Sequence, residues 1–352
     1  MTTEIVLVDP GHVKNSESDI KNAAEIIKRG GLVAFPTETV YGLGGDGTNP
    51  EASRKIYAAK GRPSDNPLII HIAHPEDAEK YTYTNETYYK LAERFMPGPL
   101  TVVLRARDIV PPETRGGLST VAVRCPSHPV ARRLIELSGR PIAAPSANLS
   151  GSPSPTSAGH VIDDMQGRVD MIIDGGECEI GLESTIVKLD DDGSMTLLRP
   201  GRVTLSELAC IAPVSLADAV TDRLKEGQVA LSPGMKYRHY APSSPLLLVD
   251  GNLSQVTEYI KKENKEKIAI LCYTDDKQSI AEQLPNADIY ILGARDNIDE
   301  QARHLFSILR DADKQSYDVI YAPLPSIDGV GLALYNRMIR AAAHTVIKLR
   351  QG

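Results

Sequence analysis

The chain has 352 residues, which at about 150 residues per domain predicts two domains. Hydrophobic residues make up 41% of it and charged residues 24%, an ordinary balance that excludes a wholly disordered protein. The formal net charge is −7, and neither half of the chain is basic, which argues against a protein that coats nucleic acid electrostatically.

Membrane and metal classes are also disfavoured. The apolar runs are far shorter than the roughly 20 residues needed to cross a bilayer, and the N-terminus lacks the basic start and apolar stretch of a secretory signal. The 4 cysteines lie far apart with no Cys-x-x-Cys pair. We therefore expect a reduced, cytoplasmic protein without a membrane segment, a disulfide framework or a metal held by protein side chains.

The first 200 residues mix helical and strand-like segments. Residues 19–29 carry apolar side chains at helical spacing before Gly30-Gly31, Asn49-Pro50 is a typical opening for a helix over 50–60, and residues 87–95 predict a third helix. Short apolar runs predict buried strands at 32–35, 67–72, 100–104, 121–124, 141–144, 169–173, 184–188 and 195–198. Because several strands have no helix between them, we expect an α/β domain with a mixed sheet.

The pattern changes after a helical stretch at residues 204–211. A Pro- and Gly-punctuated segment, 231–242, is followed by strict alternation of strands and helices. The predicted strands are 245–249, 268–272, 289–292 and 319–322, and the predicted helices are 253–263, 276–283, 298–311 and 331–346. This alternation predicts a smaller, Rossmann-like parallel α/β domain over 244–352, joined to a domain of residues 1–206 by a linker at 207–243.

Two glycine-containing motifs point to different ligands. Gly42-Leu-Gly44-Gly-Asp-Gly47 fits the spacing of a dinucleotide loop, but residues 36–41 separate it from the preceding strand, so we expect a tight loop around a smaller group. Lys60-Gly-Arg62-Pro63 ends a predicted helix, where cations favour the helix dipole. Gly61 and Pro63 would equally project the two cations into a loop that suits a polyphosphate.

Strand ends carry further polar groups. Ser146 and Asn148 follow an apolar strand in a small-residue turn, which is either an anion-binding nest or an Asx-capped turn. Arg124 and Arg199 each end a strand. No Ser-His-Asp arrangement or nucleophilic cysteine stands out, so a reaction driven by positioning and charge neutralisation fits better than covalent catalysis.

The order of these motifs resembles a known family. Phe35-Pro-Thr-Glu-Thr-Val-Tyr-Gly-Leu-Gly44, then Lys60-Gly-Arg62, then Ser146-Ala-Asn148, is similar to the YrdC-like threonylcarbamoyl-AMP synthases. The segment 232–242 and the tail 331–337 resemble the two-domain branch. The resemblance implies a YrdC-like mixed, twisted sheet with a concave site. It also implies synthesis of L-threonylcarbamoyladenylate from threonine, bicarbonate or CO₂, and ATP with Mg²⁺, with release of pyrophosphate.

The resemblance also implies roles for individual residues, with Lys60 and Arg62 as the catalytic pair. The implied ATP-binding residues are Lys60, Arg62, Asn66, Thr120, Ser146, Asn148, Ser154, Arg199, Tyr237 and His239. The implied threonine-binding residues are Thr39, His71, Arg124, Ala144 and Ser184. Lys236, Tyr237 and His239 would form a lid that excludes water. The product would pass to a tRNA-modifying threonylcarbamoyl transferase machinery.

Two other functions remain as alternatives. A YrdC-like concave surface is compatible with an RNA-binding module, although the acidic first domain disfavours strong direct binding of nucleic acid. Carbamoyl transfer to another acceptor is the other alternative, and the absence of Cys-x-x-Cys zinc motifs argues against it.

Overall fold

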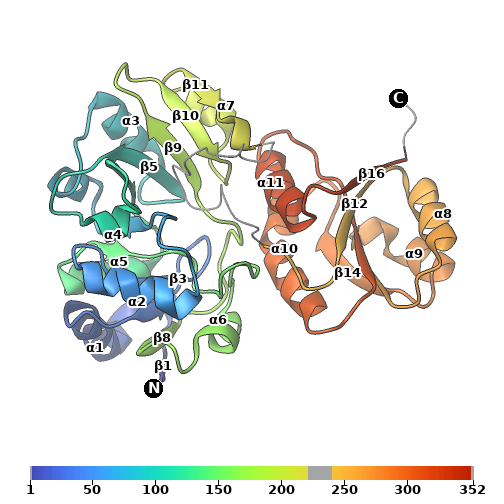
Figure 1. Cartoon of the computed structure of the whole chain (residues 1–352), viewed down its shortest axis with the longest axis horizontal. Helices are drawn as coiled ribbons and strands as arrows, with labels where there is room; N and C mark the ends of the chain where they lie inside the picture. The colour runs from blue at the N-terminus through green and yellow to red at the C-terminus, as the bar shows by residue number, and fades with distance from the viewer. Residues whose placement is uncertain (1, 221–239, 350–352) are drawn as a thin grey trace. The chain divides into compact units, whose positions relative to one another are not determined.

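The computed structural model describes residues 2–220 and 240–349, and Figure 1 shows their helices and strands. The chain divides into two compact units. The first contains Met1–Ser150 and Ser154–Tyr237, and the second contains Gly151–Pro153 and Arg238–Gly352. Part of the segment expected as a linker forms a strand at the edge of the first unit's sheet, and its residues 221–239 lie outside the described residues.

The first unit is built on a mixed sheet that has 11 strands among the described residues. In sheet order these are β1 (Glu4–Leu7), β8 (Met171–Asp174), β2 (Val33–Phe35), β3 (Gly42–Asp46), β7 (Ile142–Ala143), β4 (Ile69–His71), β6 (Thr120–Arg124), β5 (Leu100–Arg105), β9 (Thr185–Leu189), β10 (Met195–Arg199) and β11 (Val214–Leu216). Parallel and antiparallel neighbours alternate irregularly along the sheet, which confirms the expected mixed α/β domain.

Helices cover this sheet unevenly. They are α1 (Glu17–Lys28), α2 (Pro50–Lys60), α3 (Glu86–Phe95), α4 (Pro112–Arg115), α5 (Pro129–Ser138), α6 (Ala158–Met165) and α7 (Leu205–Ala209). Apolar side chains of α1 and α5 pack with β2 and β8, while those of α2, α3 and α6 share a core with the opposite face. A third cluster contains Ile69, Val103, Ala122, Ile186 and Leu198, and its described members come from strands and from Ala217. The face of β4, β6, β5, β9 and β10 that carries this third cluster is therefore the one available for a site.

The glycine motif lies in a strand, so the prediction of a tight loop there is wrong. Gly42–Asp46 forms β3 in the interior of the sheet, antiparallel to both β2 and β7. A Cβ added to Gly44 would lie 2.7 Å from side-chain carbons of Ile142 and Phe35. The glycines are needed because neighbouring side chains approach this strand closely, and no ligand is required to explain them.

The second unit has a parallel five-stranded sheet in the order β14 (Asp288–Gly293), β13 (Ile268–Tyr273), β15 (Val319–Pro323), β12 (Leu246–Asp250) and β16 (Val346–Lys348). Its helices are α8 (Leu253–Glu263), α9 (Lys277–Gln283), α10 (Ile298–Asp313) and α11 (Gly331–Ala341), with α8 and α9 on one face and α10 and α11 on the other (Figure 1). The parallel α/β prediction is confirmed. The last predicted helix ends earlier than expected, because positive φ angles at Ala343 and His344 turn the chain into β16.

Candidate active site

Strand pairing brings the predicted threonine-binding residues together on one face of the first sheet. His71 of β4 pairs with Arg124 of β6, which pairs with Thr101 of β5, which in turn pairs with Ile186 of β9. Partners across neighbouring strands share a face, and so do residues two apart in one strand. His71, Arg124, Thr101 and Ser184 therefore form a row across four strands, although their strands run in different directions.

A buried ion pair lies at the centre of this row. Arg124 is 4% exposed, and its Nη2 lies 2.9 Å from Oε1 of Glu38, which is also 4% exposed. Backbone N–H groups of Glu38 and Ser127 also face this carboxylate. Glu38 precedes Thr39, whose buried hydroxyl lies 2.9 Å from that of Thr37. A buried carboxylate thus lies beside the guanidinium expected to bind the substrate's carboxylate.

The environment fixes the charges of this group. Burial opposes ionisation of Glu38, but the Arg124 guanidinium outweighs burial and holds the pKa of the carboxyl below its usual range. Burial, assisted by the Arg124 charge, lowers the pKa of His71 to about 3. The Nδ1 atom of His71 is 3.2 Å from the carbonyl oxygen of Ile142. Since a carbonyl only accepts, Nδ1 carries the proton, and Nε2 of the neutral ring keeps its lone pair.

A second polar group continues the row into β9 and β10. The hydroxyl of Ser184 is 2.7 Å from that of Thr101. Arg199, at the end of β10, donates from Nε to the carbonyl of Ser184 at 3.1 Å and from Nη2 to its hydroxyl at 3.2 Å. These contacts hold Arg199, predicted for ATP, against Ser184, predicted for threonine, so the two predicted subsites meet here.

Lys60 joins the end of α2 to the turn that follows β7. The Asn49 side chain caps the start of α2, and Gly61, with a left-handed φ of 61°, ends it directly after Lys60. Lys60 is 2% exposed, and its Nζ donates to the carbonyls of Ser146 at 2.5 Å and Asn148 at 2.6 Å. The expectation that Lys60 projects into a loop is therefore wrong, because its ammonium is buried among the backbone carbonyls of the Ser146–Asn148 turn.

The turn itself is tightly bonded. The Ser146 hydroxyl donates to Oδ1 of Asn148 at 2.5 Å, and the Asn148 amide donates to the carbonyl of Leu149 at 2.7 Å. Ala144, which begins the turn, is 3% exposed, and its N–H donates to Ile69 at the start of β4. The predicted nucleotide residues Ser146 and Asn148 thus lie two and four residues beyond the predicted threonine residue Ala144.

The remaining predicted ATP residues lie in three places. Arg62 donates from its guanidinium to the carbonyls of Asn66 and Pro67. Asn66 is 2% exposed, and within the described residues its Oδ1 has no hydrogen-bond partner. Thr120 begins β6 on the same face as Arg124, because the two are four residues apart in one strand. Ser154 is 1% exposed and donates to Glu183 at 2.5 Å. Lys236, Tyr237 and His239 lie outside the described residues.

Sequence reasoning missed three polar groups of this region: Glu38, Thr101 and Glu183. Glu38 had a signal, since it is an acidic residue between two threonines directly after a buried strand. Glu183 precedes Ser184 and contacts Ser154. Thr101 lies within an apolar run that predicts a buried strand, and only the pairing with Arg124 shows that it faces the site.

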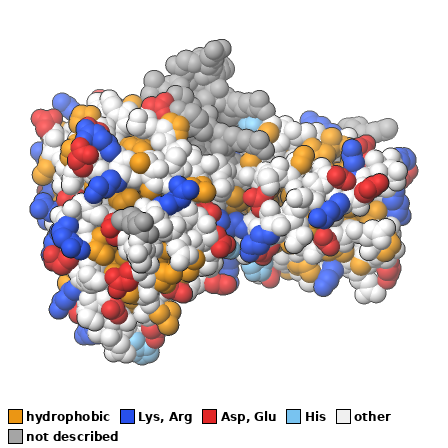
Figure 2. Space-filling view, turned by 60° about the horizontal axis from the view of Figure 1, so that its bottom comes forward, with side chains coloured by type: hydrophobic (Ala, Val, Ile, Leu, Met, Phe, Trp, Pro, Cys, Tyr) orange, Lys and Arg blue, Asp and Glu red, His pale blue; other side chains and the backbone are white. Residues whose placement is uncertain are grey.

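The described residues contain neither a cluster of metal ligands nor a helix that could span a membrane. Within residues 2–220 and 240–349, no three His, Cys, Asp or Glu side chains gather as they would around an ion. No helix in those ranges is long and apolar enough to span a bilayer. On the face drawn in Figure 2, Lys and Arg side chains of the first unit are interspersed with Asp and Glu side chains.

Comparison with known proteins identifies the class. A family model described as telomere recombination, covering Sua5, YciO and YrdC proteins, matches residues 25–201. A second, described as the threonylcarbamoyl-AMP synthase C-terminal domain, matches residues 203–343. The chain is therefore a Sua5/YrdC-type protein with an additional C-terminal domain.

Full-length relatives narrow this class further. Threonylcarbamoyl-AMP synthase from Pyrococcus abyssi is 45% identical, covering 95% of this chain and 96% of the relative, and that from Bacillus subtilis is 42% identical with 96% coverage of both. The crystal structure of P. abyssi Sua5 complexed with L-threonine matches with a TM-score of 0.87 and 43% identity, over 98% of this chain and 99% of that one. The chain belongs to the two-domain threonylcarbamoyl-AMP synthase family.

Proposed function

We propose that the protein condenses L-threonine, bicarbonate or CO₂, and ATP into L-threonylcarbamoyladenylate and pyrophosphate. The reaction would use the row of polar residues from His71 to Arg199 on one face of the first unit's sheet. The observation that carries this proposal is the contact of Arg199 with Ser184, because it would join the proposed threonine pocket to the proposed nucleotide pocket. A reaction between an amino-acid carbamate and an α-phosphorus requires the two substrates to meet in this way.

The ion pair of Arg124 and Glu38 matches the two charges of an amino acid. The Arg124 guanidinium has five N–H donors, so it can hold the substrate's carboxylate as well as Glu38. The carboxylate of Glu38 would then accept from the substrate's amine. Thr39, Ala144 and Ser184 complete the proposed pocket, in which hydroxyl groups and one small residue suit the threonine side chain.

His71 supplies a neutral hydrogen-bond acceptor. Its lowered pKa keeps the ring uncharged at physiological pH, and its hydrogen bond to Ile142 leaves Nε2 with a lone pair. We propose that Nε2 accepts a hydrogen bond from the neutral threonine amine and so directs its nitrogen at the carbon of CO₂ or bicarbonate. With CO₂ the amine proton passes to solvent as the C–N bond forms, and with bicarbonate it leaves with the hydroxyl group of that carbon as water. The product of this step is a carbamate.

The carbamate oxygen then bonds to the α-phosphorus, the bond from that phosphorus to the α–β bridging oxygen breaks, and pyrophosphate leaves. We propose that Lys60, Arg62 and Arg199 offset charge on the phosphates and that the Ser146–Asn148 turn binds them. Asn66, Thr120 and Ser154 would bind elsewhere on the nucleotide. Mg²⁺ would be held by the phosphates and water, and it would supply positive charge.

Three further parts of the proposal rest on family membership. Tyr237 and His239, with Lys236, are proposed to contact the nucleotide and to exclude water from the carbamate and the mixed anhydride. The protein is proposed to act in the cytoplasm. Its product is proposed to pass to a transferase that modifies tRNA beside the anticodon.

The test is pyrophosphate release by the full-length protein. Release from ATP should require both threonine and bicarbonate, and mass spectrometry should detect threonylcarbamoyl-AMP in the same mixture. Serine, which lacks the methyl group of threonine, and valine, which replaces its hydroxyl with a methyl, are the matched controls. Full-rate release without threonine would contradict the proposal.

A further inference from the structure

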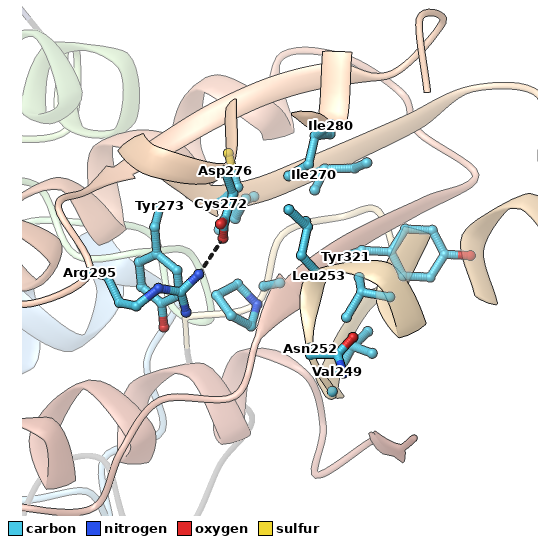
Figure 3. A pocket seen from close by; sticks show the side chains of 15 residues that line it. Val249, Asn252, Leu253, Ile270, Cys272, Tyr273, Asp276, Ile280, Arg295 and Tyr321 are labelled. Atoms are coloured by element: carbon cyan, nitrogen blue, oxygen red, sulfur yellow. Dashed lines mark hydrogen bonds and ion pairs between the residues drawn. The ribbon is translucent and has the colours of Figure 1, made fainter. Parts of the chain in front are cut away.

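The second unit contains a cavity that the proposed reaction does not use. Its volume is about 270 Å³, and it opens where the parallel strands β12, β13 and β15 end. Its walls include Leu253 and Val256 of α8, Ile270 of β13 and Ile280 of α9. Figure 3 shows Tyr273, Asp276 and Arg295 together at one side of this cavity, with Leu253 and Asn252 at another.

The topology of the sheet explains the position of the cavity. From β12 the chain moves towards one edge of the sheet, through β13 to β14, and from β15 it moves towards the other edge, to β16. The helices after β12 and β13 therefore lie on the opposite face from the helix after β15 (Figure 1). In open α/β sheets, ligands bind outside the carboxyl ends of strands at such a reversal. The cavity lies at this point.

The lining combines apolar walls with one polar side. Nη2 of Arg295 lies 2.6 Å from Oδ2 of Asp276, and the Arg295 guanidinium lies over the Tyr273 ring, 4.3 Å from its centroid. Arg295 is 57% exposed and Asp276 is 17% exposed, so both are reachable from solvent. A carboxylate acceptor beside a guanidinium donor matches a ligand edge that presents a donor next to an acceptor. The planar Tyr273 ring and Arg295 guanidinium favour a flat ligand.

Phosphate is disfavoured at this cavity. The first turn of α8 is closed by a capping box in which Asn252 and Gln255 each accept from the other's backbone N–H. Those N–H groups would otherwise be available to an anion. The carboxylate of Asp276 adds negative charge, and the Asp276–Arg295 pair has no net charge. The cavity therefore suits an uncharged ligand.

We propose that this cavity binds an uncharged, flat nitrogen heterocycle, namely a nucleobase or a nucleoside without phosphate. The heterocycle would lie between the aliphatic walls, with its donor and acceptor atoms towards Asp276 and Arg295. This site belongs wholly to the second unit, and it is separate from the proposed ATP and threonine pockets.

The experiment uses the full-length protein with labelled isoleucine methyl groups and adenosine as the probe, in the presence of saturating ATP. Saturable chemical-shift changes should appear at Ile270 and Ile280, which line the cavity, and not at Ile20 and Ile27 of α1. AMP should bind at least about tenfold more weakly than adenosine. Its phosphate would be repelled by the Asp276 carboxylate and would find the N–H groups of the capped first turn of α8 already bonded.

Two substitutions test whether adenosine binds in this cavity or elsewhere on the surface. Asp276→Asn should weaken adenosine binding about tenfold, the loss expected for one hydrogen bond to a charged group. Glu282→Gln, an exposed change on α9, the helix that directly follows Asp276, is the matched control and should leave binding unaltered. The proposal is overturned if millimolar adenosine leaves Ile270 and Ile280 unshifted, if AMP binds as tightly as adenosine, or if shifts occur only at Ile69 and Ile186 in the first unit.

Discussion

Replacing Lys60 with methionine tests whether this residue organises the Ser146–Asn148 turn in addition to its proposed contact with phosphate. The substitution keeps most of the side chain's apolar length and removes the ammonium. In the native protein that ammonium donates to two carbonyls, Ser146 at 2.5 Å and Asn148 at 2.6 Å, in a position that is 2% exposed. Hydrogen bonds to a charged group contribute about 1.5–3 kcal/mol each, and part of this is offset by relief of burying the charge.

We expect Lys60→Met to lower the free energy of unfolding of the first unit by about 3 kcal/mol. For a unit of this size, that loss corresponds to a fall in Tm of about 6–12 °C. Pyrophosphate release should also be abolished, because the charge proposed to bind phosphate and the geometry of the turn are both lost. Lys60→Ala should behave similarly, with a further loss of packing.

Calorimetry and the pyrophosphate assay measure both effects on the full-length protein. Lys55→Met is the matched control on α2, because Lys55 is exposed and its Nζ contacts one carbonyl, that of Gly30 at 2.7 Å. That variant should lose less than about 1 kcal/mol and remain active. If Lys60→Met melts at the native temperature, the buried ammonium does not hold the turn, and the reasoning is wrong.

Other changes probe the threonine side of the site. In steady-state kinetics, Glu38→Gln should raise the KM for threonine about tenfold and change the KM for ATP little. Equal increases in the two KM values would contradict the proposed contact of Glu38 with the threonine amine. Folding lowers the pKa of His71 from its ordinary value of 6.5 to about 3. Between these two pH values the unfolded chain binds more protons than the folded one, so the free energy of unfolding decreases as the pH falls from 6.5 towards 3. At pH 5 the loss is about 2 kcal/mol relative to pH 8, and urea titrations of His71→Asn should lack this contribution. Ser184→Ala should cost about 1–2 kcal/mol of stability and lower kcat/KM, since Thr101 and Arg199 lose a buried partner; unchanged stability and activity would show that its hydroxyl is dispensable.

The sequence predicted secondary structure best where apolar periodicity and end signals agree. Asn49-Pro50 and Gly61 placed the bounds of α2, and strict alternation predicted the parallel second unit. The two-residue strand β7 was predicted as part of a longer apolar run. Helices α5 and α6 were missed, although both carry amphipathic patterns. β3 was missed because glycine disfavours strands locally, and only close packing against Phe35 and Ile142 explains its glycines.

The candidate site was predicted in outline, because several of its residues stand at strand ends or in turns that the sequence marks. The contacts among them were not predictable. The pairing of Glu38 with Arg124 joins the turn after β2 to the end of β6, and the burial of Lys60 depends on a turn that is 86 residues further along the chain. Local patterns contain no information on such long-range neighbours, which follow from sheet order alone.

The row from His71 to Arg199 has a consequence for how the protein matures. Its members come from five strands scattered across more than a hundred residues, and β1 at the start of the chain pairs with the much later β8. A nascent chain that ends before Ser184 lacks both this residue and Arg199, so the contact that would join the two proposed subsites cannot form. High contact order makes assembly of such a sheet slow. Substrates should consequently protect the finished unit as a whole against hydrogen exchange, since their binding energy is realised only once every strand has docked.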